Sequence, residues 1–214
     1  MNFLDEKLEN YTQTHSDIEP ELLKKINRET NLHVLKPRML SGHFQGRLLS
    51  MISKMCSPKN ILEIGTYTGY SALCLAEGLQ KEGQITTIDN NKELESRVRS
   101  YFNESEYSKK INYIVEDALI TLNKIDLSIF NLVFIDADKT NYLNYYQILM
   151  DQLQTGAIIL ADNVLWSGKV LDNIKENDEE TRNLRAYNET IQNDDRVENI
   201  LLPIRDGIML CRVK

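Results

Sequence analysis

Cysteine is scarce in this chain of 214 residues, and the three that occur lie far apart. Cys56, Cys74 and Cys211 each lie in an apolar stretch. An odd number of distant cysteines does not indicate a disulfide framework or a zinc site. We therefore expect all three to be small, buried core residues of a protein that works in the reducing cytoplasm.

Long hydrophobic runs are also missing. The chain has no stretch of about 18 apolar residues, which excludes a transmembrane helix, and its acidic start has no signal-peptide pattern. The 32 acidic residues outnumber the 25 Lys and Arg residues, and the formal net charge is -7. This balance disfavours broad electrostatic attraction to nucleic acid or to a membrane surface.

Short apolar runs alternate with helical patterns from Lys59 onward. This alternation predicts an α/β fold with a mostly parallel sheet and helices on both faces. The predicted parallel strands are 60–64, 84–88, 111–115, 131–135 and 157–161, and the predicted helices between them are 70–80, 92–103, 119–124 and 142–153. Two more runs, 196–202 and 208–213, are joined by a short turn and predict an antiparallel hairpin.

The residues before this core are helical in pattern and contain no strong strand. Pro20 opens a helix over 21–30, and another helix is expected over 45–55. We expect one domain over residues 1–214, in which 1–56 form a helical cap and 57–214 form the α/β core.

Polar side chains follow two of the predicted strands. The run 131–135 leads into Asp136 and Lys139, and the run 157–161 leads into Asp162 and Asn163. If these strands are parallel neighbours, their ends lie roughly 5 Å apart. Two carboxylates and an amide suit a hard cation such as Mg²⁺, or alternatively Mn²⁺ or Ca²⁺. Each Asp could instead cap the next helix, but the combination favours a cation site.

The first strand of the core leads into a turn that contains Gly65 and Gly69. These glycines let the backbone turn tightly beside a ligand at a helix N-terminus, although their spacing is not that of a dinucleotide-binding loop or a P-loop. Glu63 lies inside the strand, where a buried carboxylate needs a cationic partner. Asp89 ends the second strand, where it can accept hydrogen bonds from ribose hydroxyls or cap a helix. A ligand with a ribose and an ammonium group describes S-adenosylmethionine, and Asp117 or Ala118 could lie at the edge of its adenine.

At this point the chain resembles the cation-dependent O-methyltransferases, the family of catechol and caffeoyl-CoA O-methyltransferases. The resemblance covers residues 36–214 and rests on five segments: LEIGTYTGYS (62–71), FIDADK (134–139), NYLNYY (141–146), DNVLWSG (162–168) and LLPIRDG (201–207). It implies a class I methyltransferase fold with a Rossmann-like sheet of seven strands, and a homodimer.

The resemblance also assigns roles to individual residues. Lys139 is the implied catalytic lysine and works beside Asp136. The implied metal ligands are Asp136, Asp162 and Asn163. The implied cofactor-binding residues are Met39, Ser41, Glu63, Gly65, Tyr67, Ser71, Asp89, Asp117, Ala118 and Asp136.

These assignments predict methyl transfer to a small molecule with two vicinal aromatic hydroxyl groups. A cation that binds both oxygens makes a phenol a better nucleophile, and Lys139 would accept its proton. The first turn of a helix is unfavourable for a solvated lysine, which supports that role. Trp166 is expected either to form a wall of the acceptor pocket or to be a core aromatic. The charged segment 171–182 reads as a loop over the pocket and lacks a clear match to the aromatic residues of caffeoyl-CoA enzymes.

Two other functions stay open. Relatives of this family methylate hydroxyuridine in tRNA, and a basic patch would support that substrate; its candidate residues are Lys24, Lys25, Arg28, Lys36 and Arg38. The net charge makes nucleic acid the less favoured partner. A nucleotide-binding module without catalysis is the third hypothesis, and the cation trio together with Lys139 argues against it.

Overall fold

The computed structural model describes residues 5–214 and contains a seven-stranded sheet with the order β3-β2-β1-β4-β5-β7-β6. The strands are β1 (Asn60–Ile64), β2 (Gln84–Asp89), β3 (Ile111–Val115), β4 (Leu132–Ile135), β5 (Ile158–Asp162), β6 (Val197–Leu202) and β7 (Ile208–Val213). The pairs from β3 to β5 are parallel, whereas β7 is antiparallel to both β5 and β6. The predicted parallel core and the predicted hairpin are therefore confirmed.

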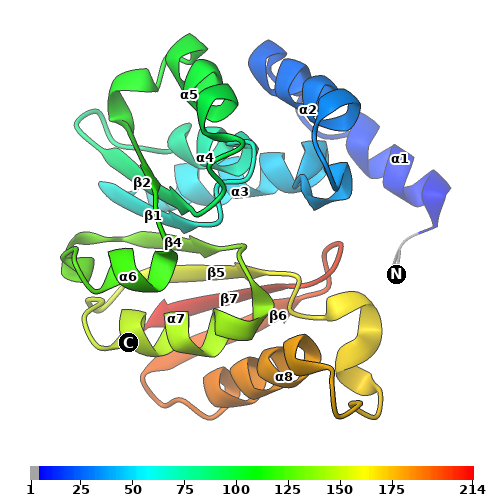
Figure 1. Ribbon diagram of the computed structural model, residues 1–214, viewed down its shortest axis with the longest axis vertical. Coiled ribbons are helices and arrows are strands. Elements are labelled where there is room, and N and C mark those ends of the chain that lie inside the picture. Colours follow the sequence, from blue (N-terminus) through cyan, green and yellow to red (C-terminus); the bar gives the residue numbers. More distant parts are fainter. Residues whose placement is uncertain (1–4) are drawn as a thin grey trace.

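Helices cover both faces of the sheet (Figure 1). The α-helices are α1 (Glu6–Thr14), α2 (Glu21–His33), α3 (Gly42–Cys56), α4 (Tyr70–Ala76), α5 (Glu95–Glu104), α6 (Ala118–Leu122), α7 (Tyr142–Met150) and α8 (Glu179–Gln192). The 3₁₀ turns are η1 (Pro37–Met39), η2 (Ser108–Lys110), η3 (Leu127–Ile129), η4 (Lys139–Asn141) and η5 (Trp166–Leu171). None of the helices in residues 5–214 is long and apolar enough to cross a membrane.

The sheet separates two hydrophobic clusters. Helices α2 to α5 pack on one face, where Ile26, Leu49 and Tyr70 are buried, and helices α6 to α8 pack on the other, where Tyr146 and Tyr187 are buried. The near-continuous apolar sequence of β4 follows from this arrangement, because each of its four residues is buried on one face or the other.

The helical segment before β1 is fastened to the core by α3. Helix α3 packs against α4. Glu77, the C-cap residue of α4, accepts hydrogen bonds from three residues of α3: Arg47 Nη2 (2.6 Å), Ser50 Oγ (2.7 Å) and Lys54 Nζ (2.8 Å). These three donors lie on successive turns of α3. Gly78 lets the two helices approach closely, because a Cβ at that position would overlap the backbone of Ser53. Whether the cap and the core form a single domain stays a prediction.

Two expectations are wrong. Cys74 and Cys211 are buried, but Cys56 is exposed, because it is the last residue of α3 and the chain turns away there through Ser57 (φ 45°). The segment 171–182 is not entirely a loop, because α8 begins at Glu179. The side chain of Asp178 caps this helix by accepting a hydrogen bond from Thr181 N at 3.1 Å. The alternation of charged residues with Leu184, Tyr187 and Ile191 marks a helix that buries only one narrow face.

Candidate active site

A cavity of about 1010 Å³ lies at the carboxyl ends of β1, β2, β4 and β5. It is located where the strand order reverses between β1 and β4, the usual place for a ligand in an open α/β sheet. The predicted residues that line it are Met39, Gly65, Tyr67, Asp89, Asp117, Ala118, Asp136, Lys139, Asp162, Asn163 and Trp166. The structure thus brings together residues that are up to 127 positions apart, from Met39 to Trp166 (166 − 39).

Three predicted residues lie behind the lining. Ser41 is buried at the start of α3, and Glu63 and Ser71 are buried beneath the turn that follows β1. The cavity wall does not include the side chains of these three residues. Their assignment as cofactor-binding residues stays a prediction.

The turn after β1 has a backbone that only a few residue types adopt readily. Gly65 has a φ of 103°, and a Cβ there would overlap the carbonyl oxygen of Asp136. Tyr67 also has a positive φ of 48°, and its backbone N–H donates to Asp89 Oδ2 at 2.7 Å. The other oxygen of Asp89 accepts from Asn91 N at 2.8 Å. Because each carboxylate oxygen can accept more than one hydrogen bond, Asp89 can still accept from a ligand.

Glu63 is fully buried between β2 and α4 and makes an unusual contact. The hydroxyl of Thr87 donates to Glu63 Oε2 at 2.5 Å, while Glu63 Oε1 has no hydrogen-bond partner among the described residues. Burial, reinforced by the charges of Asp136 and Asp89, raises the pKa of the Glu63 carboxyl to about 8, against the opposing hydrogen bonds of Ser71 and Thr87. The surroundings of Glu63 therefore favour its protonated form.

Asp136 and Asp162 lie side by side at the ends of two adjacent strands. The register pairs Ile135 with Ala161, so the two aspartates follow paired positions. Asp162 is 3% exposed, and burial together with the charge of Asp136 raises the pKa of its carboxyl to about 6. Asn163 follows with a positive φ of 60°, and its backbone N–H donates to Asp162 Oδ1 at 2.8 Å. Two carboxylates and an amide side chain thus border one part of the cavity.

Lys139 lies next to this pair and is only 6% exposed. Its Nζ donates to Asp136 Oδ1 at 3.2 Å and to the hydroxyl of Tyr142 at 2.6 Å. The Tyr142 hydroxyl donates in turn to the backbone carbonyl of Asp162 at 3.0 Å. Tyr142 is not among the site residues predicted from the sequence. Its position three residues after Lys139 places both side chains on the same side of a helical turn.

Trp166 lines the cavity and also packs against the core cluster of α7 and α8, and its role toward an acceptor stays a prediction. The Lys139 Nζ lies 6.0 Å from the centre of its ring and the Lys169 Nζ lies 5.6 Å from it. The indole N–H of Trp166 is buried and has no acceptor among residues 5–214. The Trp166 ring therefore lies close to Lys139 and keeps a buried donor without an acceptor.

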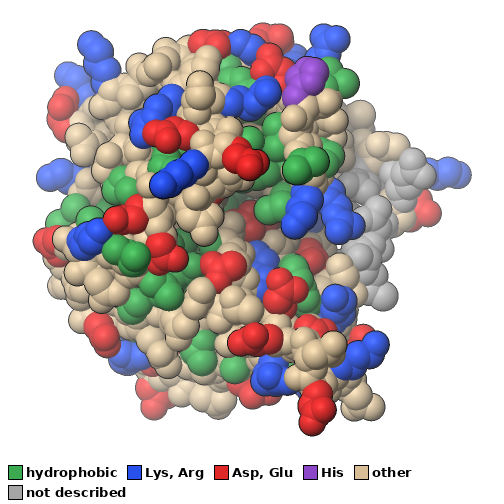
Figure 2. Space-filling model, in the orientation of Figure 1, with side chains coloured by type: hydrophobic (Ala, Val, Ile, Leu, Met, Phe, Trp, Pro, Cys, Tyr) green, Lys and Arg blue, Asp and Glu red, His purple; other side chains and the backbone are tan. Residues whose placement is uncertain are grey.

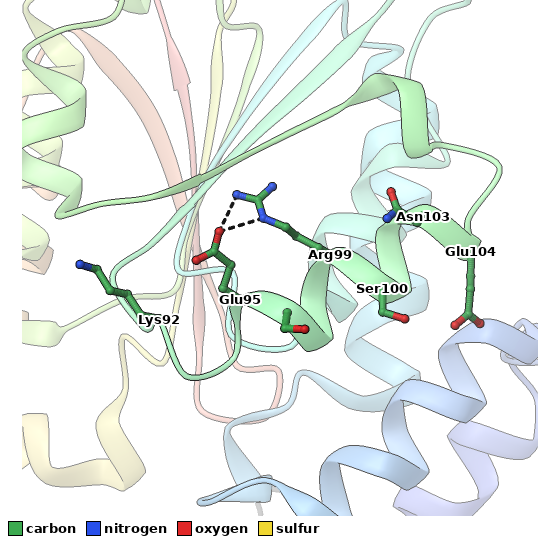
Figure 3. A pocket seen from close by; sticks show the side chains of 7 residues that line it. Lys92, Glu95, Arg99, Ser100, Asn103 and Glu104 are labelled. Atoms are coloured by element: carbon green, nitrogen blue, oxygen red, sulfur yellow. Dashed lines mark hydrogen bonds and ion pairs between the residues drawn. The ribbon is translucent and has the colours of Figure 1, made fainter.

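A second, shallow depression lies along α5 and the turn before it (Figure 3). Three of its four charged groups are paired: Arg99 Nε donates to Glu95 Oε1 at 2.9 Å, and Glu104 pairs with Lys25 at 2.7 Å. None of the predicted site residues lines it. The cavity at the strand ends is the candidate active site.

This combination of a reversed parallel sheet, a cavity at its strand ends and a closing antiparallel hairpin is shared with solved methyltransferases. The O-methyltransferase TomG from Streptomyces achromogenes, solved in complex with SAM, is 26% identical with a TM-score of 0.88 over 97% of this chain and 96% of that chain. An O-methyltransferase from Bacillus cereus, solved in complex with SAH, is also 26% identical, with a TM-score of 0.89 over 97% of each chain.

Sequence comparison leads to the same class. The profile of the O-methyltransferase family matches residues 13–214. A caffeoyl-CoA O-methyltransferase from Stellaria longipes is 33% identical over 203 residues, which cover 91% of this chain and 84% of that protein. The chain therefore belongs to the family of O-methyltransferases, enzymes that depend on S-adenosylmethionine.

Proposed function

We propose that this enzyme transfers the methyl group of S-adenosylmethionine to one hydroxyl of a small aromatic molecule with two vicinal hydroxyls, with the help of a divalent cation. The observation that carries this proposal is the convergence of Asp136, Asp162 and Lys139 in one cavity beside the glycine turn. Mg²⁺ is the first choice of cation, and Mn²⁺ or Ca²⁺ would suit the same ligands.

The residues present fit a cation. Two carboxylates at the ends of adjacent strands repel each other, and Lys139 contacts only one of them, Asp136. No group of three His, Cys, Asp or Glu side chains suited to a metal is found in residues 5–214, so the third protein ligand would be the Asn163 amide. Oxygen ligands of this kind, completed by water and by the acceptor, suit a hard cation.

The cavity also fits the methyl donor. Asp89 still has acceptor capacity toward ribose hydroxyls, and the closely packed turn at Gly65 would allow backbone to lie beside the ligand. The relatives solved with SAM and SAH share the fold over nearly the whole chain. Asp117 and Ala118 border the same cavity where the adenine is expected.

The chemistry is an in-line displacement. The acceptor oxygen attacks the methyl carbon, the carbon–sulfur bond breaks, and its electron pair stays on sulfur. When bound, the cation would hold both acceptor oxygens and favour loss of a phenolic proton. Lys139, as the neutral amine, would receive that proton on Nζ and become an ammonium ion, and its contact with the Tyr142 hydroxyl at 2.6 Å would hold the nitrogen in place.

Trp166 would form a wall of the acceptor space, as the sequence predicts, and α8 contributes Glu180 to the lining of the same cavity. The relatives that act on caffeoyl-CoA support an aromatic acceptor. The segment before α8 lacks the aromatic residues expected for a CoA ester, which favours a smaller catechol-like molecule. Assembly as a homodimer and a cytoplasmic location stay expectations of the sequence.

The test is transfer of labelled methyl groups to caffeate, 3,4-dihydroxybenzoate, caffeoyl-CoA and bulk tRNA, each with Mg²⁺ or EDTA. We expect the small catechols to be labelled in the presence of Mg²⁺ and to stay unlabelled in EDTA. Changing Asp162→Ala should abolish this transfer while leaving the affinity for S-adenosylmethionine within about threefold. Equal transfer in EDTA, or an active Asp162→Ala variant, would contradict the cation-dependent mechanism.

If tRNA is the one substrate that is labelled, the acceptor is tRNA and not a catechol, and the methyl-transfer chemistry stays as proposed. The structure offers this outcome little support. Lys24 pairs with Glu21 at 2.6 Å and Lys25 pairs with Glu104 at 2.7 Å, so two candidates for a basic patch are neutralised. On the face shown in Figure 2, Lys and Arg side chains are interspersed with Asp and Glu.

A further inference from the structure

Arg205 reaches across the molecule from the turn between β6 and β7 to the N-terminal segment. It has a positive φ of 50°, a backbone conformation that is uncommon for a residue other than glycine. Its guanidinium donates to the carbonyls of Leu40 (3.3 Å) and Ser41, and to Gln45 Oε1 at 2.9 Å. Within residues 5–214 Arg205 forms no salt bridge, so neutral oxygens are its partners.

The contact with Arg205 fixes the orientation of the Gln45 amide. A guanidinium only donates hydrogen bonds, so the oxygen end of the amide must face Arg205 and the NH₂ end must face away. That NH₂ end donates to Asp162 Oδ2 at 2.7 Å. Gln45 is 1% exposed. A flipped amide would lose both hydrogen bonds, because its NH₂ group would face the guanidinium and its oxygen would face the carboxylate.

Asp162 thereby has both oxygens constrained. Oδ2 accepts from Gln45, and Oδ1 accepts from the backbone N–H of Asn163 at 2.8 Å. Each oxygen keeps acceptor capacity, but the plane of the carboxylate is set by these two donors. A cation that needs ligands at defined distances gains from a carboxylate that is already oriented.

We propose that Gln45 and Arg205 are positioning residues for the cation: Arg205 orients the Gln45 amide, and that amide holds the Asp162 carboxylate in its binding orientation. The inference rests on the proposed cation site. It adds that the N-terminal segment at Leu40 and Ser41 is tied to the proposed cation ligand Asp162 through one guanidinium and the Gln45 amide. Gln45 is not part of the cavity lining, whereas Arg205 contributes to it.

The test measures binding of Mn²⁺ by electron paramagnetic resonance, without an acceptor. Gln45→Met keeps the length of the side chain and removes both hydrogen bonds, and Arg205→Met removes the guanidinium. We expect each change to weaken Mn²⁺ binding about tenfold to a hundredfold. Because both act through one chain of contacts, the double variant should be no more than about threefold weaker than the weaker single variant.

Two controls separate positioning from general damage. Arg212→Met removes an arginine of β7 that pairs only with Glu198, at 3.7 Å, and should leave Mn²⁺ binding unchanged. Glu77→Gln loosens α3 against α4 without touching the Gln45–Asp162 hydrogen bond, and it should lower stability without weakening Mn²⁺ binding more than about twofold. A merely structural role of Gln45 would make its variant behave like Glu77→Gln.

The outcomes distinguish this inference from the proposed function. If the wild type binds Mn²⁺, Asp162→Ala abolishes binding and Gln45→Met binds as the wild type does, the positioning role is refuted and the cation site stands. If the effects of Gln45→Met and Arg205→Met multiply in full, the relay is refuted as well. If Asp162→Ala does not alter Mn²⁺ binding, the proposed cation site itself is wrong.

Discussion

The most quantitative consequence of the structure concerns Glu77, which joins the helical segment before β1 to the core. Arg47 contacts both of its oxygens, at 2.6 and 3.0 Å, and Ser50 and Lys54 complete the network. The side chains of Glu77 and Arg47 are each 12% exposed. Changing Glu77→Gln removes the charge and keeps the shape, so it leaves the Arg47 guanidinium partly buried without its counter-charge.

The magnitude follows from the pKa of the carboxyl. Burial acts to raise this pKa, but the hydrogen bonds from Arg47, Lys54 and Ser50 and the charge of Arg47 outweigh burial and lower it from 4.5 to about 2. At about 1.4 kcal/mol per pKa unit, this corresponds to roughly 3 kcal/mol of stability. Breaking a buried ion pair costs a similar amount, about 3–5 kcal/mol.

The pH dependence has a defined sign. Because the pKa of Glu77 is lower in the folded state, its contribution is fully present above pH 4.5 and is lost as the pH falls through 4.5 toward 2. The difference between wild type and Glu77→Gln should be about 3 kcal/mol at pH 7 and fall to roughly 1.5 kcal/mol at pH 3.

Urea denaturation at pH 7 and pH 3 measures both values. The matched control is Glu104→Gln, which breaks the pair with Lys25, whose side chains are 43% and 44% exposed. That exposed pair should contribute far less than the Glu77 network, because solvent screens it. The reasoning would be refuted if Glu77→Gln lost as little stability as the control variant. It would also be refuted if the stability difference between wild type and Glu77→Gln grew as the pH fell.

Two other variants test strand β1 and the turn that follows it. Gly65→Ala combines a φ of 103° with overlap against the Asp136 carbonyl, so it should weaken S-adenosylmethionine binding at least about tenfold and lower the melting temperature more than Gly156→Ala does. Gly156 has a φ of 90° but open space around it, and equal effects in calorimetry and thermal melting would show that the overlap is unimportant. For Glu63, the pKa of about 8 in the folded protein means that stability is complete below pH 4.5 and declines as the pH rises toward 8, by about 1.4 kcal/mol per pH unit. Glu63→Gln should remove this decline between pH 5.5 and 8.5 in urea denaturation of the ligand-free protein, and parallel trends in the two proteins would disprove the buried proton.

The sequence was sufficient for features that depend on local patterns. The strands β1, β3 and β7 have the predicted bounds, because each is an apolar run bordered by polar residues or turn-forming residues. The pairing of β4 with β5 and the cavity at their ends followed from the rule that connects strand order with ligand position.

The sequence was insufficient where distant contacts decide. Helix α8 went unpredicted because its buried stripe of Leu184, Tyr187 and Ile191 is sparse among charged residues. Gln45 and Arg205 were missed because they lie 160 positions apart and each has an ordinary local context. The assignment of Lys139 could be made from its spacing to Asp136, whereas the role of the Tyr142 hydroxyl required the fold.

The position of β7 has a consequence for the order in which the enzyme is completed. This strand lies between β5 and β6, and β6 has β7 as its sheet partner. During synthesis, β1 to β5 emerge first and can pair with each other, whereas Arg205 and β7 follow more than 40 residues after Asp162 (205 − 162). The edge of β5 therefore stays open on the ribosome until the β6–β7 hairpin inserts, and Asp162 gains its link to Arg205 through Gln45 at the same step. This side of the cavity is thus completed only after the hairpin has been synthesised.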